Sequence, residues 1–323
     1  MRLFLLRRAK IAYTYGSRAE TKDIEIEKDF RKLKVVETPL EVARTASGGL
    51  LTWSELPVWM KDNEYIISGY RKEQRCWKGC FESVYLYLHN ESVNIHSHLW
   101  GGVLFLYFLA TTKSKYLADY PTTWLDTAVF SVFLVSAVFC LCSSAMFSHA
   151  FWQITNQCHA FDYSGIVVLT VGSFYPCVYY GFFCEPHLQV LYITSITLVG
   201  TGAAYIVLNP EYAKPTHRGA RTTVFIALGL CAIVPVSHWV TVHGLQTMLA
   251  MGLHWLGLSG GFYIVGALLY ANRIPERFAP GSFDYFFASH QIFHFFVVFA
   301  ALAHYKSILV ALHYAYTRSH CEL

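Results

Sequence analysis

The stretch Ser289–Tyr305 reads SHQIFHFFVVFAALAHY, and it decides the fold class. It belongs to an apolar run over residues 288–313, which is longer than the roughly 20 residues that a helix needs to cross a bilayer. The run nevertheless opens with two histidines, His290 and His294, four residues apart. Ionisable groups inside a membrane are costly and usually mark function. The stretch therefore predicts a membrane helix with a site in its first turns.

The composition of the whole chain agrees with a membrane protein. The 323 residues are 54% hydrophobic and 14% charged, whereas soluble domains hold about 25% charged residues. The nine cysteines are scattered and form no pair of CxxC motifs, so they indicate neither a disulfide framework nor a zinc ribbon. We expect an integral multi-pass protein of the plasma membrane or an endomembrane, with the lipid bilayer as a partner and no nucleic acid.

Apolar blocks of about membrane-spanning length recur from residue 94 onward, joined by short connections that contain turn-forming residues. They predict an all-α membrane protein, a bundle of seven transmembrane helices. The predicted spans are 95–112, 124–147, 162–183, 187–208, 221–240, 247–270 and 288–313.

Lysine and arginine predict the orientation of this bundle. With seven spans the two termini lie on opposite sides of the membrane. When the N-terminus is placed inside, only four of the 25 Lys and Arg residues lie outside: Lys113, Lys115, Lys306 and Arg318. The positive-inside rule therefore predicts a cytoplasmic N-terminus and a C-terminus that is outside or lumenal.

The same pattern divides the chain into four parts. We expect a partly disordered cytoplasmic segment over 1–50, a juxtamembrane cytoplasmic region over 51–93, the seven-helix domain over 94–313 and a short outer tail over 314–323.

The juxtamembrane region begins with a capping-box pattern, Thr52 followed three residues later by Glu55. One face of an amphipathic helix could then hold Trp53, Leu56, Trp59 and Met60. That face would lie at the membrane interface or pack on the cytoplasmic side of the protein itself, and the sequence leaves both alternatives open.

Four candidate site residues come to one depth under this topology. His149 lies at the inner end of the second span, Asp162 at the inner start of the third, and His290 and His294 in the first turns of the seventh. Histidines four residues apart share a helix face. A third histidine completes a set of three zinc ligands, which in catalytic sites leaves the fourth position to water. Zinc lowers the pKa of that water, and Asp162 could accept its hydrogen bond or proton.

The other intramembrane histidines, taken one by one, are more typical of hydrogen bonds between helices. They are His159, His238, His243, His254 and His304. His96 and His98 are two residues apart and lie on different faces of a helix, so a joint metal site there is disfavoured.

The motifs HNESVNIHSHLWGG, SSAMFSH, FDYSGI and SHQIFHFFVV, in this order, resemble those of the PAQR family, which groups the progestin/adipoQ receptors with hemolysin III-related proteins. The resemblance runs from about Leu56 to about His313. The first motif is similar to fungal adiponectin-receptor-like members, which are linked to zinc homeostasis and to sterol or lipid signalling.

The resemblance implies seven helices, a cytoplasmic N-terminus and a zinc ion held by His149, His290 and His294, with Asp162 beside the metal-bound water. Animal relatives are regarded as ceramide hydrolases, so the implied reaction is zinc-assisted amide hydrolysis of a sphingolipid. One departure concerns His149. The family places three residues between the serine and the histidine of this motif, whereas Ser144 and His149 enclose four. One extra residue turns a helical side chain by about 100°.

Three functions compete on this basis. A zinc hydrolase for ceramide-like lipids predicts a lipid-sized cavity beside the metal. A non-catalytic receptor, or a regulator of zinc or sterol homeostasis, predicts a structural zinc and needs no cavity. A transporter predicts polar residues through the whole thickness of the membrane and ranks last. The sequence names neither a ligand nor an oligomeric state.

Overall fold

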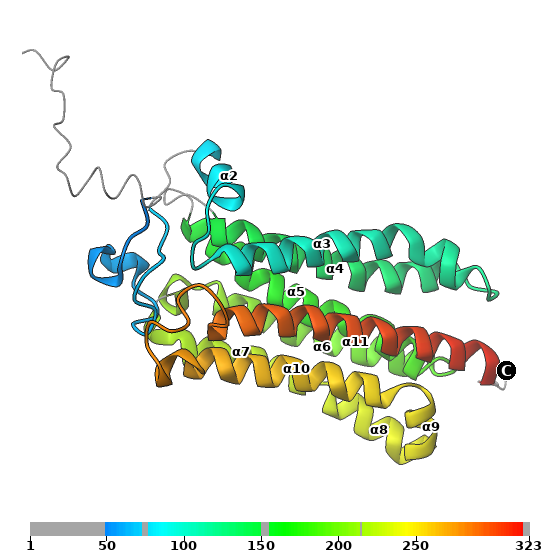
Figure 1. Cartoon of the computed structure of the whole chain (residues 1–323). Helices are drawn as coiled ribbons and strands as arrows, with labels where there is room; N and C mark the ends of the chain where they lie inside the picture. Colours follow the sequence, from blue (N-terminus) through cyan, green and yellow to red (C-terminus); the bar gives the residue numbers. More distant parts are fainter. Residues whose placement is uncertain (1–48, 73–76, 150–154, 214, 319–323) are drawn as a thin grey trace, which may run out of the picture. The chain divides into compact units, whose positions relative to one another are not determined.

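The computed structural model describes residues 49–72, 77–149, 155–213 and 215–318. Within them the chain is all-helical apart from one isolated bridge between Leu51 and Tyr70. Figure 1 shows the helices, whose bounds are α2 (Trp77–Tyr85), α3 (Ser92–Thr112), α4 (Trp124–His149), α5 (Thr155–Gly181), α6 (Pro186–Val207), α7 (Arg218–Leu230), α8 (Ile233–His243), α9 (Leu245–Ala250), α10 (Leu253–Asn272) and α11 (Ser289–Arg318).

Seven helical segments in the described residues are long and apolar enough to cross a membrane. Their bounds are Ser92–Leu117, Trp124–Met146, Phe161–Gly181, Pro186–Val207, Arg218–His243, Leu253–Phe278 and Ser289–Arg318. The prediction of seven transmembrane helices is confirmed, and each predicted span overlaps its observed counterpart. The protein is therefore an integral multi-pass membrane protein.

Two of the predicted spans are interrupted. The fifth is divided into α7 and α8, with a turn at Cys231–Ala232 between them. The predicted sixth span starts with the short helix α9, which ends in a turn at Met251–Gly252 before α10 begins. Gly252 has a φ of +93°, a left-handed conformation that glycine adopts without steric cost. Hydropathy does not report such breaks, because the turn residues are themselves apolar or small.

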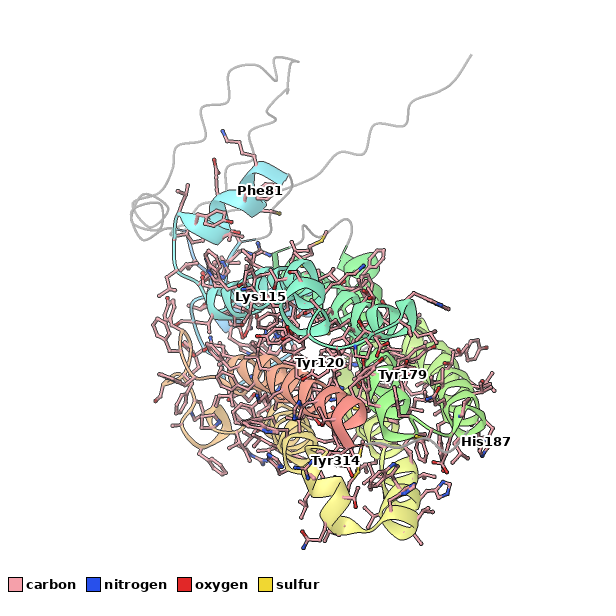
Figure 2. All side chains as sticks on the ribbon, turned by 90° about the vertical axis from the view of Figure 1, so that its right-hand side faces the viewer. Phe81, Lys115, Tyr120, Tyr179, His187 and Tyr314 are labelled. Carbon is pink, nitrogen blue, oxygen red and sulfur yellow. The ribbon has the colours of Figure 1, made fainter. Side chains whose placement is uncertain are left out.

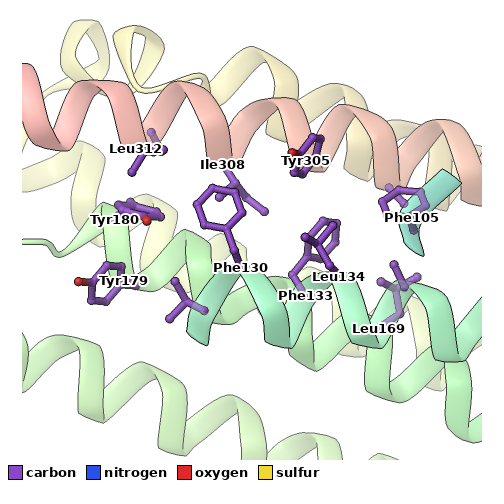
Figure 3. Close-up of a cluster of buried hydrophobic side chains, with 14 of the residues drawn as sticks. Phe105, Phe130, Phe133, Leu134, Leu169, Tyr179, Tyr180, Tyr305, Ile308 and Leu312 are labelled. Atoms are coloured by element: carbon purple, nitrogen blue, oxygen red, sulfur yellow. The ribbon is translucent and has the colours of Figure 1, made fainter. Parts of the chain in front are cut away.

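Helix α11 lies centrally in the bundle. It packs against α10 on one side and against α3 and α5 on the other, and Figure 2 shows this arrangement in a view along the bundle from the end at which α11 finishes. The apolar core is formed mainly by α3, α4, α5 and α11. Figure 3 shows its large side chains, among them Phe105, Phe130, Phe133, Tyr180, Ile308 and Leu312.

A buried carboxylate ties three of these helices together at the end where α11 finishes. Asp126 in the first turn of α4 accepts hydrogen bonds from the backbone and side chain of Thr123, a helix-capping arrangement. It also accepts hydrogen bonds from the hydroxyls of Tyr180 on α5 and Tyr316 on α11, both at 2.9 Å. A buried polar group needs such partners, so Asp126 fixes how α5 and α11 meet α4.

Small residues let α4 and α5 approach closely. A Cβ atom at Gly172 would lie 2.3 Å from the Ser136 hydroxyl oxygen, and one at Gly165 would lie 3.0 Å from the Cα of Cys140. Small residues at such contacts are the usual means of close helix packing in membranes. The pairing of Gly165 with Cys140 also sets the level at which Asp162 enters the bundle.

The amphipathic helix expected after Thr52 is not formed. Two short 3-10 turns, Trp53–Glu55 and Val58–Met60, stand in its place, separated by Leu56 and Pro57. The capping box itself is present. Proline at position 57 removes a backbone donor and disfavours a helical conformation at Leu56, which explains the interruption. Leu56 is buried against the protein's own residues, which agrees with the alternative in which this segment packs on the protein.

The segment 51–70 is attached to the connection between α10 and α11 by two buried carboxylates. Asp284 accepts hydrogen bonds from the backbone of Ile67 and from the backbone and hydroxyl of Ser68. Glu276 accepts one from the Asn63 amide at 3.0 Å. The segment therefore covers the end of the bundle at which α11 begins.

Glu276 also anchors the first turn of α11. It accepts hydrogen bonds from the backbone N–H and the hydroxyl of Ser289, and it is fully buried. A carboxylate at a helix N-terminus satisfies unpaired N–H groups and interacts favourably with the helix dipole.

The cysteines form one disulfide bond that the sequence did not predict. Cys184, in the connection between α5 and α6, is disulfide-bonded. A count of scattered cysteines cannot reveal a single bridge, because the partners depend on which loops meet in space.

Candidate functional site

The first two turns of α11 bring two imidazoles together. His290 and His294 place their Nε2 atoms 3.2 Å apart, with the rings nearly perpendicular at 88°. Two imidazole nitrogens bound to one zinc at about 2.0–2.1 Å in tetrahedral geometry would be about 3.4 Å apart. The observed spacing is that of a hydrogen bond between the two rings, and it is also compatible with two ligands of a single zinc ion. His294 is almost completely buried, at 2% exposure.

The backbone of α3 orients the second imidazole. His294 donates from Nδ1 to the Asn94 carbonyl oxygen at 3.1 Å, because a carbonyl can only accept. This tautomer leaves a lone pair on Nε2, where a metal would bind. Metal-ligating histidines usually donate their other N–H to a carbonyl or a carboxylate in this way.

The side chain of Asn94 lies against the first imidazole. Its Nδ2 atom is 2.7 Å from a Glu91 carboxylate oxygen and 3.3 Å from His290 Nδ1, while its buried Oδ1 has no partner among the described residues. If His290 ligates a metal through Nε2, its Nδ1 carries a proton and needs an acceptor. Rotation of the amide would present Oδ1 to that proton, but it would also set Oδ1 against the Glu91 carboxylate that Nδ2 now contacts, so a metal-binding His290 requires Glu91 to move as well.

A residue that the sequence analysis set aside belongs to this cluster. His98 stacks on His294 with ring centroids 3.8 Å apart and donates from Nε2 to the His294 carbonyl oxygen at 3.2 Å. Its buried Nδ1 has no partner in the described part of the chain. The informative spacing was Asn94 and His98, four residues apart on α3, which matches His290 and His294 on α11.

Asp162 comes to the level of His294 through the register of α5 against α11. The two helices run in the same direction, because Asp126 binds Tyr180 and Tyr316 near their ends. His304 donates from Nε2 to the Ser173 carbonyl oxygen at 2.9 Å. Asp162 lies eleven residues before Ser173, and His294 ten before His304. At 1.5 Å per residue these offsets differ by only about 1.5 Å, so the expected common depth of Asp162 and His294 is met.

The Asp162 carboxylate is hydrogen-bonded by the Ser144 hydroxyl of α4. Asp162 and Ser144 line one cavity together with His290 and His294. The carboxylate therefore faces the same space as the two imidazoles.

The remaining predicted ligand cannot be placed. Helix α4 continues as a helix through His149, but the side chain of His149 lies outside what the structure describes. Within the described residues no group of three His, Cys, Asp or Glu side chains has the geometry of a metal site. The third ligand therefore stays a prediction, as does the effect of the extra residue after Ser144.

The cavity has a volume of about 360 Å³, which lies within the range of small-molecule pockets. It extends from His290 and Asp162 past His304 to Trp239 on α8, between α5, α7, α8, α10 and α11. Its lining is mostly apolar. Arg221 also lines it and lies over the Tyr163 ring at 4.9 Å.

The sequence matches the model of a known family, described as Haemolysin-III related, over residues 86–305. This range includes α3, the cavity and the histidine pair of α11. The chain belongs to the haemolysin-III related family.

Named relatives carry the match over most of the chain. "ADIPOR-like receptor IZH2" of Saccharomyces cerevisiae is 36% identical over 90% of this chain and 93% of its own length. "Heptahelical transmembrane protein 1" of Arabidopsis thaliana is 36% identical over 81% of both chains. "Progestin and adipoQ receptor-like protein 1" of Caenorhabditis elegans is 35% identical over 88% of this chain and 66% of its own length. The resemblance to the progestin/adipoQ receptor family is thus confirmed.

The connection that leads into α3 of this haemolysin-III related protein contains a fully buried histidine, His89. Its Nδ1 accepts a hydrogen bond from the Glu91 backbone and its Nε2 donates to the Ser83 carbonyl, both at 3.1 Å. Burial, followed by the nearby Arg71, lowers the pKa of His89 from 6.5 to about 4.

We expect this histidine to make the folded state sensitive to mild acid. In the folded protein His89 stays neutral down to about pH 4, whereas in the unfolded chain it takes up a proton below about pH 6.5. The contribution of neutral His89 to stability is therefore full above pH 6.5 and declines as the pH falls towards 4. The thermal unfolding midpoint of the wild type should fall over this interval more steeply than that of His89→Gln. Of the neighbouring charged or titratable groups, Arg71 and His96 lower this pKa and Glu91 raises it. Parallel pH profiles of the two proteins would contradict the assignment.

Proposed function

We propose that this protein is a zinc-dependent amide hydrolase that acts on ceramide or a similar sphingolipid inside the membrane. The observation that carries the proposal is the pair of Nε2 atoms of His290 and His294, 3.2 Å apart, in the wall of an apolar cavity that Asp162 also lines. His149 is the proposed third ligand. A zinc ion bound there would supply an activated water and polarise the amide carbonyl.

The chain's own groups have separable tasks in this reaction. Asn94 and His98 hold the ring of His294 from two sides, through its Nδ1 proton and by stacking. Asp162 accepts a proton at its carboxylate and returns it to the leaving amine, with the Ser144 hydroxyl fixing its orientation. The apolar walls hold the lipid chains and keep bulk water away from the reacting bond.

The cavity supports a lipid substrate over a soluble one. It is apolar over most of its length and lies within a bundle of membrane helices. A molecule with one amide group and long hydrocarbon chains would place the amide at the histidines and a chain along the cavity. Arg221 would face the polar head of such a molecule.

We further propose the orientation that the positive-inside rule predicts, with the α11 N-terminus and the site near the cytoplasmic leaflet. The disulfide at Cys184 supports it. The connection from α5 to α6 would then face the outside or a lumen, where disulfides persist.

A non-catalytic function is the alternative, favoured by the names of relatives that are called receptors. In that case the zinc is structural and the protein is a receptor or a regulator of zinc or sterol homeostasis. The two proposals share the metal site and differ in turnover.

Zinc stoichiometry tests the site first. We expect elemental analysis of the purified protein to give about one zinc per chain in the wild type and close to none in His290→Ala and His149→Ala, since three ligands are needed to hold the metal. His254→Ala serves as the matched control, because His254 lies at the far end of α10, away from the cavity.

The same preparations separate the alternatives. Release of fatty acid from ceramide by the wild type, lost together with zinc, supports the hydrolase. Zinc without turnover supports the receptor. Zinc that persists in His149→Ala would remove His149 from the ligand set, and a wild type without zinc would overturn both proposals.

A further inference from the structure

The cavity contains a second polar position far from the zinc-binding histidines. His304 lines the cavity, and only 5% of its surface is exposed. His304 lies ten residues after His294 on α11, which at 1.5 Å per residue is about 15 Å further along the helix. A buried imidazole in the middle of a membrane is costly unless it has a use.

One nitrogen of this ring has a structural use. Nε2 donates to the Ser173 carbonyl oxygen at 2.9 Å and lies 3.6 Å from the Cys177 sulfur. This confirms the expectation that His304 forms a hydrogen bond between helices. Because Nε2 carries the proton, Nδ1 of the neutral ring has a lone pair and can only accept.

That acceptor is unused. Nδ1 of His304 makes no hydrogen bond within the described residues. It is also not completely enclosed by protein atoms, so some of its surface is accessible. Since His304 borders the cavity, Nδ1 is available to a molecule inside it. The hydroxyls of Thr170 and Ser173, which line the same stretch, donate to carbonyls of their own helix and keep free lone pairs. The wall at this level therefore offers hydrogen-bond acceptors.

We propose that this cluster, Thr170, Ser173 and His304, is a subsite for a hydroxyl group in the middle of a lipid chain. The hydroxyl donates to Nδ1 of His304 while the head of the lipid lies at His290 and His294. The preferred ligand is thus a lipid whose chain is hydroxylated about 15 Å from its head. This inference rests on the proposed function, which places the lipid head at the histidine pair.

The test uses hydroxylated fatty acids as probes for the full-length protein in lipid nanodiscs. Octadecanoic acid, 2-hydroxyoctadecanoic acid and 12-hydroxyoctadecanoic acid each compete with radiolabelled octadecanoic acid. Carbon 12 of an extended chain lies about as far from the carboxyl group as the 15 Å between His294 and His304. We expect the 12-hydroxy acid to bind about fivefold more tightly than the unsubstituted acid, as a net hydrogen bond allows. The 2-hydroxy acid should show no such gain.

Variants assign the preference to His304. In His304→Phe the order should invert, because the 12-hydroxyl would be buried without a partner. His304→Gln, which can still donate to Ser173 and accept through Oε1, should keep part of the preference. Unchanged binding of octadecanoic acid shows that each variant is folded.

The outcomes separate this inference from the proposed function. Failure of all three acids to displace the label from the wild type, or of the label to bind, would count against a lipid cavity and therefore against the proposed function. Equal binding of the three acids by the wild type would overturn the subsite alone, whether or not the variants fold. A 12-hydroxy preference that survives in His304→Phe would overturn the assignment to His304.

Discussion

Replacement of Asp162 by asparagine should lower the rate of ceramide hydrolysis by about 100-fold or more and leave zinc in place. Asparagine keeps the shape of the carboxylate and can still bond the Ser144 hydroxyl, but it cannot accept a proton. In enzymes, proton transfer by a positioned side chain typically contributes a factor of about 100 to 10,000 to the rate. Single-turnover kinetics on purified protein, with zinc measured on the same sample, would give both quantities.

Asp119→Asn is the matched control, because Asp119 is exposed in the connection between α3 and α4. It should change neither zinc content nor rate. Loss of zinc in Asp162→Asn would show that the carboxylate is a ligand or a support of the metal. A full rate with zinc retained would remove Asp162 from the proposed mechanism.

Replacement of Glu276 by alanine should destabilise the protein by about 3 kcal/mol, since unpaired buried donors cost about 1–3 kcal/mol each. The change leaves the backbone and hydroxyl of Ser289 and the Asn63 amide without their acceptor. Ser289 immediately precedes His290, so the first turn of α11 should loosen and zinc should bind more weakly. Thermal unfolding should shift downward by about 4–5 °C, as a dye-based assay in detergent can record.

Glu276→Gln should lie between the wild type and Glu276→Ala, because its single oxygen can accept from one or two of the three donors. Glu82→Ala removes a carboxylate from an exposed pair with Lys78 and should leave the midpoint unchanged. A midpoint for Glu276→Ala equal to that of the wild type would contradict the anchoring role assigned to this residue.

The membrane helices were predictable because bilayer thickness and hydropathy constrain them directly. What hydropathy missed were features that depend on individual residues. The turn at Cys231–Ala232 lies inside an apolar run, and Pro57 breaks a pattern that otherwise suits an amphipathic helix. The disulfide at Cys184 depends on which loops meet and leaves no local pattern.

For the site, the sequence located the pair on α11 because a spacing of four residues is a local signal. It placed Asp162 at the right depth through topology. It missed His98 as a contact of the pair, because this contact joins α3 to α11 across 196 positions. The orientation of the bundle and the binding of zinc stay predictions, since neither hydropathy nor helix packing measures them.

The hydrogen bond from His304 to Ser173 has a consequence for how this chain can change in evolution. It joins α5 to α11 at one point, and the common level of Asp162 and His294 depends on the number of residues between them and that point. A single inserted or deleted residue between Asp162 and Ser173, or between His294 and His304, would move one partner by 1.5 Å and rotate it by about 100°. The loop from α5 to α6 lies outside both counted segments and is free to vary in length. The stretch between Ser144 and Asp162, where this sequence departs from the family pattern, also lies outside both segments.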